Sequence, residues 1–282
     1  MIRKFSLFAS LLLLNSLAIA QGPWAAGKKH GYTQLLFNTI PTYNTLYYGN
    51  GNTIETEREL SDNTLAAYLE YGFSDRFTLI ANMPYIFVKG GELVDQSVTP
   101  ITEAGSLNGF GNISLSGKYT FIKKKFVAAA ILQADLPTRS FDNATGLSTG
   151  VDALTLMPKL SVGTSDDKWF LYGYFGYGIR SNDYHHIVNY GIEGGYKVAD
   201  NLTLILNLNN ISRLDNGDPS VDTPTNIRTG FYTSNQEFNA FLLKLYAEKI
   251  YKDLGALVSL GGGTGTSVAV SPAISIGVFY KW

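Results

Sequence analysis

Strict alternation of apolar and polar residues along segment 112–121 most constrains what this chain can fold into. Ile113, Leu115, Tyr119 and Phe121 occupy one set of alternate positions, whereas Asn, Ser, Lys and Thr occupy the other. Successive side chains of a β-strand point to opposite faces, so this segment has one apolar and one polar face. Similar segments, about as long as a bilayer-crossing strand, recur along the whole chain. The pattern predicts a β-barrel with lipid outside and a polar lumen inside.

The composition agrees with a membrane barrel and excludes several other classes. Charged residues make up 16% of the chain, below the roughly 25% usual for soluble domains. The chain has 18 tyrosines, 16 phenylalanines and 29 glycines, which suits closely packed strands with interfacial aromatic anchors. The formal net charge of −1 implies no basic face, so we expect no nucleic-acid partner. Without cysteine, disulfides, thiolate metal sites and a lipidated N-terminal cysteine are excluded.

The first twenty residues have the features of a secretory signal peptide. Arg3 and Lys4 precede an apolar stretch over 5–14, and Ala18-Ile19-Ala20 is a small-x-small cleavage site. We expect residues 1–20 to be removed, which leaves one barrel domain over residues 21–282. No later apolar run approaches the ~18 residues that a membrane-spanning helix needs. In a membrane, the mature chain must therefore form a closed barrel, because an open sheet leaves backbone groups unpaired in lipid.

The alternation predicts an all-β, antiparallel, up-and-down transmembrane barrel of about 12 strands. We expect the strands at residues 31–38, 64–73, 77–87, 110–121, 126–136, 153–162, 169–180, 186–198, 202–210, 238–248, 255–261 and 268–282. Prolines at positions 158 and 272 weaken two of these assignments.

The expected connections differ in length between the two ends of the barrel. Those after every second strand are short turns, whereas the connections at 40–63, 89–109, 137–151 and 211–232 are long and polar. Short periplasmic turns and long outer loops are typical of barrels in the bacterial outer membrane of Gram-negative cells. An even strand number also places both termini on the periplasmic side.

Aromatic residues gather near the expected periplasmic ends of the outward faces, where rings favour the boundary between lipid and water. We predict a membrane girdle of Tyr71, Phe73, Tyr119, Phe121, Trp169, Tyr280 and Trp282. The terminal aromatic Trp282 resembles the recognition signal of outer-membrane assembly substrates. We therefore expect outer-membrane lipid and the barrel-assembly machinery as partners, the latter through the last strand.

A secreted β-sandwich is the main structural alternative, since it also has alternating strands and polar turns. The expected strands are roughly twice the ~5–6 residues common in soluble sheets. The aromatic residues also gather at strand ends, as in membrane girdles. Both features favour the barrel.

The polar faces carry charges of both signs and several tyrosines, which we predict to line the lumen. They are Tyr68, Glu70, Lys118, Asp135, Lys159, Tyr172, Tyr174, Arg180, Glu193, Lys244, Tyr246 and Glu248. Because buried charges are usually paired, a ladder of ion pairs that stiffens or partly plugs the lumen is favoured. Opposed charged rows that orient a polar solute are the alternative. The tyrosines either line a path for aromatic solutes or fill the lumen.

Other residue clusters do not have the geometry that catalysis or metal binding requires. His185 and His186 are adjacent and face opposite ways on a strand, so they cannot bind one metal. With three histidines in all and no Gly-x-Ser-x-Gly motif, we expect no enzyme, no metal and no cofactor. Segment 261–265 is glycine-rich but lacks the Lys-Ser/Thr of a phosphate loop, so we predict a hairpin loop there. The aspartates of segment 215–222 match no calcium motif.

Three short motifs resemble one family of outer-membrane proteins. Segment 109–119, Gly-Phe-Gly-Asn-Ile-Ser-Leu-Ser-Gly-Lys-Tyr, is similar to the Gly-Phe-Gly-Asp…Lys-Tyr segment of the proteins labelled "putative MetA-pathway of phenol degradation". Segment 136–138 fits the family's Leu-Pro-Thr-Gly, and Gly22-Pro23-Trp24 fits its early tryptophan. Asn112 stands where Asp is usual, and Arg139 where Gly is usual. The resemblance implies a barrel channel linked to uptake of small hydrophobic or aromatic compounds.

The sequence therefore favours an outer-membrane channel that passes small-molecule solutes by passive diffusion. A barrel of about 12 strands is narrower than the 16–18-stranded porins, which restricts it to small solutes. The alternative is a non-conducting barrel with a structural or surface-binding role, which acts through its extracellular loops.

Overall fold

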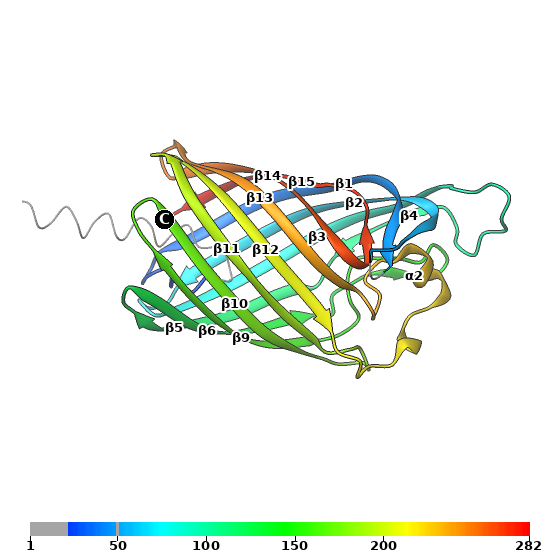
Figure 1. The fold of residues 1–282 in the computed structure, drawn as a ribbon, viewed down its shortest axis with the longest axis horizontal. Coiled ribbons are helices and arrows are strands. Elements are labelled where there is room, and N and C mark those ends of the chain that lie inside the picture. The colour runs from blue at the N-terminus through cyan, green and yellow to red at the C-terminus, as the bar shows by residue number, and fades with distance from the viewer. Residues whose placement is uncertain (1–21, 49–50) are drawn as a thin grey trace, which may run out of the picture.

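The computed structural model describes residues 22–48 and 51–282, which form one closed antiparallel barrel of 12 strands (Figure 1). The strands of the ring are β1 (Gly31–Tyr48), β2 (Thr53–Gly72), β3 (Phe77–Leu93), β5 (Ile113–Lys123), β6 (Phe126–Leu136), β9 (Thr155–Ser165), β10 (Trp169–Arg180), β11 (Ile187–Ala199), β12 (Leu202–Arg213), β13 (Glu237–Tyr251), β14 (Leu254–Ala269) and β15 (Ala273–Lys281). β1 pairs with β2 on one side and with β15 on the other, which closes the ring. The predicted all-β barrel and its strand number are confirmed, whereas the predicted signal peptide, 1–20, lies outside the described residues.

The remaining elements are short and belong to the loops. They are β4 (Gly105–Phe110), β7 (Phe141–Asp142), β8 (Leu147–Ser148), the 3₁₀ turn η1 (Pro219–Val221) and the helix α2 (Pro224–Thr229). Among the described residues, no helix has the length and apolar character needed to span a membrane.

Period-two alternation decides which side chains face the interior. In β12, Leu204, Leu206 and Leu208 are exposed on the outer surface, whereas Thr203 and Ile205 are buried inside. Adjacent strands repeat the pattern, so large apolar side chains cover the outside of the ring. A closed barrel with this apolar exterior is suited to lipid, and the protein is an outer-membrane β-barrel.

The two ends of the barrel differ as predicted. Tight turns join β2 to β3, β5 to β6, β9 to β10, β11 to β12, and β13 to β14 at the end where the chain terminates. In Figure 1 this end lies on the left, and α2 and β4 lie at the opposite end. We refer to them as the periplasmic and the extracellular end, respectively.

One predicted loop proves to be largely strand, and a second is partly strand. The predicted loop 40–63 is a long hairpin, since β1 continues to Tyr48 and β2 begins at Thr53. The predicted loop 89–109 is shortened by the end of β3 and by β4. Polar residues at these positions suggested irregular structure. Backbone pairing such as Thr45 with Glu55 nevertheless continues the ladder past the apolar band, where water can face the sheet.

The glycine-rich segment 261–265 is not a hairpin loop, which corrects the sequence prediction. It lies inside β14 and pairs residue by residue with β13. A Cβ atom at Gly265 would lie 2.0 Å from the Glu237 carbonyl oxygen, so glycine permits this close approach. Pro272, predicted within the last strand, lies in the connection before β15. Pro158 does lie within a strand, β9, opposite Leu132.

The predicted strand 110–121 is interrupted at Gly111 and Asn112. β4 ends at Phe110 and β5 begins at Ile113, although both pair with β3. A Cβ atom at Gly111 would lie 2.8 Å from the Ile86 side chain, which explains the glycine. The break turns Asn112 toward the extracellular loops described below.

The facing of β12 generates a stability prediction. Leu206→Arg should lower the free energy of unfolding by roughly 2–4 kcal/mol, because it places a charge against the membrane interior. Asn207→Arg should lower it far less, because the Asn207 side chain faces the interior of the barrel. There it donates a 3.1 Å hydrogen bond to Glu193. Urea unfolding in lipid bilayers measures both values. Equal losses at the two positions would contradict the assignment of faces.

Candidate functional site

Residues 22–30 fold into the periplasmic mouth, and we call them the N-terminal plug. Trp24 is 6% exposed and packs edge-on against Phe170 and Tyr172 of β10. The ring centroids lie 6.2 and 5.8 Å apart, respectively. Such contacts between aromatic edges and faces stabilise the plug against one side of the mouth.

The hydrogen bonds that hold the plug are spread along its backbone. The Thr120 hydroxyl donates to the Pro23 carbonyl at 2.7 Å. The Ala26 N–H donates to the Thr78 hydroxyl at 3.0 Å. These anchors come from β3 and β5, so the plug lies over the part of the mouth formed by β3 to β10.

A second group of rings covers the part of the mouth formed by β13, β15, β1 and β2. Tyr246 and Phe279 stack with centroids 4.1 Å apart, and Phe279 stacks on Tyr32 at 5.6 Å. Tyr32 in turn meets Tyr68 edge-on at 5.9 Å. The rings form a continuous layer, so large side chains fill much of the lumen at this level.

The predicted lumen tyrosines all lie inside the barrel. They are Tyr68, Tyr172, Tyr174 and Tyr246, each of them 8% exposed or less. The Tyr174 hydroxyl donates to Asn209 at 2.7 Å.

Three of the predicted acidic residues form ion pairs with lysines inside the barrel. The pairs are Glu70 with Lys118, Glu193 with Lys244, and Glu248 with Lys281. The N···O distances are 3.8 Å in the first pair and 3.1 Å in the second. Because an unpaired buried charge is costly, these pairs stabilise the interior and reduce its net field.

The other three predicted charges lie nearer the extracellular end and have different surroundings. Asp135 accepts a 2.7 Å hydrogen bond from Gln133, and Lys159 donates to Asn189 at 3.2 Å. The Nε atom of Arg180 is buried without a hydrogen-bond partner among the described residues. The structure thus divides the predicted charges into a paired periplasmic group and an extracellular group that forms no direct ion pair among the described residues.

A cavity of about 390 Å³ lies inside the barrel between β1, β2, β3, β5, β6 and β9, and we call it the chamber. Its apolar and aromatic lining is Leu36, Ala66, Ile80, Ile131, Tyr32 and Tyr68, and its polar lining is Gln34, Asn82, Asn112, Ser114, Ser116, Gln133, Asp135 and Lys159. One part of the wall can contact a ring, while another offers amide and hydroxyl groups. This combination suits a small amphipathic molecule.

Two loops close the extracellular end above the chamber. The loop from 137 to 154 carries the β7–β8 hairpin, whose Leu147 is fully buried. Leu147 packs in one apolar cluster with Leu60, Val88 and Phe231, the last of which belongs to the loop that carries α2. In that same loop, burial raises the pKa of the Tyr232 hydroxyl well above its ordinary value. The cluster joins both loops to the barrel wall.

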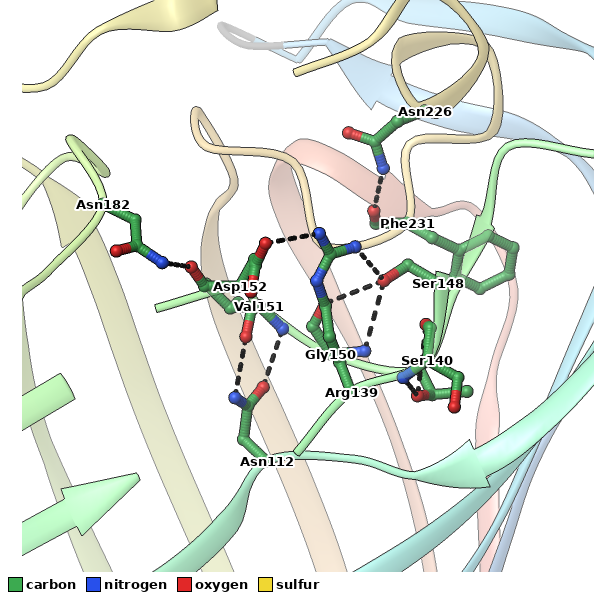
Figure 2. Close-up of polar contacts among 11 residues, drawn as sticks. Asn112, Arg139, Ser140, Ser148, Gly150, Val151, Asp152, Asn182, Asn226 and Phe231 are labelled. Carbon is green, nitrogen blue, oxygen red and sulfur yellow. Dashed lines mark hydrogen bonds and ion pairs between the residues drawn. The ribbon is translucent and has the colours of Figure 1, made fainter. Parts of the chain in front are cut away.

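Asn112 holds the first of these loops in place (Figure 2). Its amide donates to the carbonyls of Leu136 and Val151 at 2.9 and 2.8 Å, and its oxygen accepts from the Val151 N–H at 2.7 Å. A Cβ atom at Gly150 would lie 2.5 Å from the Asn112 side-chain oxygen. The Thr138 hydroxyl donates to the Gly111 carbonyl beside it. The two motifs that resemble the family, 109–119 and 136–138, therefore meet at one point.

Arg139 strengthens the same loop, and Figure 2 shows it beside Asp152 and Ser148. Its guanidinium donates to Asp152 at 2.8 Å and to Ser148 at 3.3 Å. The Thr229 hydroxyl of α2 donates to the Gly146 carbonyl at 2.8 Å, which links the second loop to the first. Asn112 and Arg139, the two departures from the family pattern, thus both form hydrogen bonds that hold the loop from 137 to 154.

The predicted girdle residues lie near the periplasmic end of the barrel. Most are well exposed on its outer surface, between 40 and 55%: Phe73, Tyr119, Phe121, Trp169, Tyr280 and Trp282. Tyr71 is half-buried, because its ring meets Phe73 edge-on at 4.9 Å. Their role as membrane anchors stays a prediction.

Sequence reasoning missed several interior residues. Phe279 and Lys281 alternate with the outward residues of the last strand, so extending the alternation to its end identifies both. Trp24 lies outside any strand, and its place in a family motif was the signal available. No periodicity could have indicated that it enters the barrel.

With the barrel and its interior described, comparison with known proteins identifies the family. Residues 43–220 match the family described as "Putative MetA-pathway of phenol degradation". The chain belongs to this family. The matched range includes motifs 109–119 and 136–138, whereas residues 22–24 lie outside it.

Two solved structures similar in fold to this chain are outer-membrane proteins. The COG4313 outer membrane channel from Pseudomonas putida F1 has a TM-score of 0.66 and 16% identity, with 94% of this chain and 100% of that chain covered. The NanC porin has a TM-score of 0.51 and 9% identity, with 89% of this chain and 100% of that chain covered. At these identities the comparison shows a shared fold. A search of curated proteins finds no significant match.

The buried pair between Glu193 and Lys244 generates a stability prediction. Lys244→Met should lower the free energy of unfolding by about 3–5 kcal/mol, because it leaves the Glu193 carboxylate buried without its cation. The double variant Glu193→Gln with Lys244→Met should recover most of the loss. Urea unfolding followed by gel mobility measures the three proteins. A double variant as unstable as the single one would show that packing, rather than charge, dominates.

The contacts of Asn112 predict how the extracellular loop responds to substitution. Asn112→Asp keeps the acceptor for Val151 but removes both donated hydrogen bonds and places a carboxylate beside two carbonyl oxygens. Hydrogen exchange at the backbone amides of residues 138–151 should therefore accelerate, whereas exchange in β12 should not change. Unchanged exchange in the loop would mean that Asn112 does not hold it.

Proposed function

We propose that this protein is a gated outer-membrane channel through which small solutes, particularly ring compounds with polar substituents, diffuse passively. The observation that carries the proposal is the chamber, a cavity of about 390 Å³ within the barrel. A barrel with only a structural role needs no internal cavity of this size. The outer-membrane barrel fold and the family membership support a transport role.

The lining of the chamber supports this choice of solute. Leu36, Ile80 and Ile131 can pack against a hydrocarbon ring, and Tyr68 adds an aromatic face. Asn82 and the neighbouring amides and hydroxyls can hydrogen-bond polar substituents. The paired charges at Glu70 and Glu193 leave little net field to select ions, so conductance should be small and weakly ion-selective.

Passage requires movement at both ends of the lumen. The loop held by Asn112 lies beside the chamber on the extracellular side, while the aromatic layer and the N-terminal plug occupy part of the periplasmic mouth. Loops that close binding sites commonly open on microsecond to millisecond timescales. The closed arrangement described here is therefore compatible with slow, gated diffusion.

The filled interior also supports the second candidate, a non-conducting barrel that acts through its extracellular loops. Ion pairs and stacked rings occupy much of the lumen, and the two outer loops form an ordered surface around Leu147 and Phe231. A catalytic role has less support, since the described lining of the chamber includes no histidine. Transport measurements separate the two candidates.

We also propose that the exposed aromatic residues anchor the barrel in outer-membrane lipid and that its last strand is recognised by the barrel-assembly machinery. Tyr280 and Trp282 stack with centroids 6.0 Å apart, and both are exposed on the outer surface. Rings in this position favour the lipid–water boundary. Trp282→Ala should slow assembly, which the delayed appearance of the heat-modifiable folded form would report.

Filling the chamber tests the transport proposal. Ala66 lines the chamber, and its neighbour Ala67 points to the opposite face of β2. Ala66→Trp should reduce uptake of a small hydroxylated aromatic compound to the level of cells without the protein, because the indole occupies the chamber. Ala67→Trp, the matched control, should preserve uptake.

Purified wild-type and variant proteins in planar bilayers, tested with aromatic compounds and with sugars, provide the direct measurement. Absence of wild-type conductance, together with absence of uptake in cells, would refute the channel and favour the second candidate. Equal uptake by the Ala66→Trp variant and the wild type would exclude the chamber from the route.

A further inference from the structure

A second cavity, of about 680 Å³, opens at the periplasmic end beside the N-terminal plug, and we call it the vestibule. Its lining includes Glu70, Lys281, Phe279 and Tyr32. Tyr32 also lines the chamber, so one side chain borders both cavities. The interior route from the chamber to the periplasm is therefore interrupted by a thin layer in which Tyr32 lies.

The pairing of β1 with β2 explains this arrangement. Tyr32 lies opposite Glu70, and Gln34 lies opposite Tyr68, with all four side chains pointing inward. The pair of Gln34 and Tyr68 faces the chamber, whereas Glu70 faces the vestibule. Tyr32 therefore lies at the step between the two levels of the interior.

The Tyr32 ring is held across this step by contacts with neighbouring side chains. It stacks on Phe279 and meets Tyr68 edge-on. Its hydroxyl donates a 2.6 Å hydrogen bond to Gln34. These contacts join side chains only. Rotation of the Tyr32 ring would therefore break no backbone hydrogen bond between strands.

Trp24 does not occupy the same position. It lines a different cavity, of about 350 Å³, together with Lys124 and Val127. It is absent from the lining of both the chamber and the vestibule as described. The Trp24 ring therefore lies next to β5, β6 and β9, whereas plug residues such as Ala26 and His30 line the vestibule.

We propose that solute leaves the chamber past Tyr32, whose ring is the partition between chamber and vestibule, and that Trp24 is not on this route. The inference rests on the proposed function and specifies its periplasmic exit. Tyr32 is then the residue that sets the size of the solute that can pass, because its ring must move aside.

The absence of native cysteine allows a direct test with a single reporter thiol. Ser116 is buried and lines the chamber, so Ser116→Cys places a thiol there. The measurement is the rate at which a small cationic methanethiosulfonate modifies this thiol in the purified, folded barrel. Access from the extracellular side is common to all the variants compared.

Tyr32→Ala should raise the modification rate by on the order of tenfold or more, because movement of the ring no longer limits access of the reagent to the thiol. Tyr32→Phe keeps the ring and should leave the rate close to that of the reporter alone. Trp24→Ala should also leave the rate unchanged. A rise with Trp24→Ala but not with Tyr32→Ala, or with neither, would overturn the proposal.

A second reporter separates opening of the partition from loosening of the barrel. Ser259 is buried on β14 and lies outside the linings of both cavities. The Ser259→Cys thiol should react equally slowly with and without Tyr32→Ala, and an equal rise at both reporters would overturn the proposal. Since modification requires no transport, absence of conductance and uptake in the wild type would refute the proposed function without altering these rates.

Discussion

The closed ring of backbone hydrogen bonds is the constraint on which the rest of this structure depends. Lipid offers no partner to a peptide group, so every strand edge within the membrane must be paired. The closing strand β15 is only half as long as β1. β14 therefore takes over as the partner of β1 near the extracellular end, where Leu46 pairs with Ala269. At the other end, Gly31 and Trp282 exchange backbone hydrogen bonds of 3.0 and 3.2 Å.

The ring determines what must happen inside it. Inward positions of 12 strands enclose more space than small side chains can fill, and large tyrosines and lysines occupy most of it. Buried charges are costly without a partner, and those nearer the periplasmic end are paired, as Glu70 is with Lys118 and Glu193 with Lys244. The chamber remains where smaller residues such as Ala66 and Ser116 face inward. The sizes of the inward-facing side chains therefore decide which parts of the lumen are filled and where the chamber remains.

Segment 109–112 and the loop that follows β6 form the architecture of the extracellular end. Glycine at positions 109, 111 and 150 lets the loop approach the barrel wall more closely than a Cβ atom would permit. Asn112 then joins the break in the β4–β5 wall to the loop through three hydrogen bonds. The same contact lies over the chamber, which Asn112 itself lines. A motif that positions a loop can therefore influence access to the interior.

The sequence by itself determined the barrel, its strand number and the facing of Leu206 or Glu193, because side-chain alternation is a local property of an extended backbone. Polar composition was a poorer guide, since it suggested loops at 40–63 where pairing between β1 and β2 continues beyond the apolar band. Only the tertiary structure decided that Trp24 enters the mouth and that Lys281 joins Glu248. Those contacts depend on ring closure and strand register, which bring together residues far apart in the sequence.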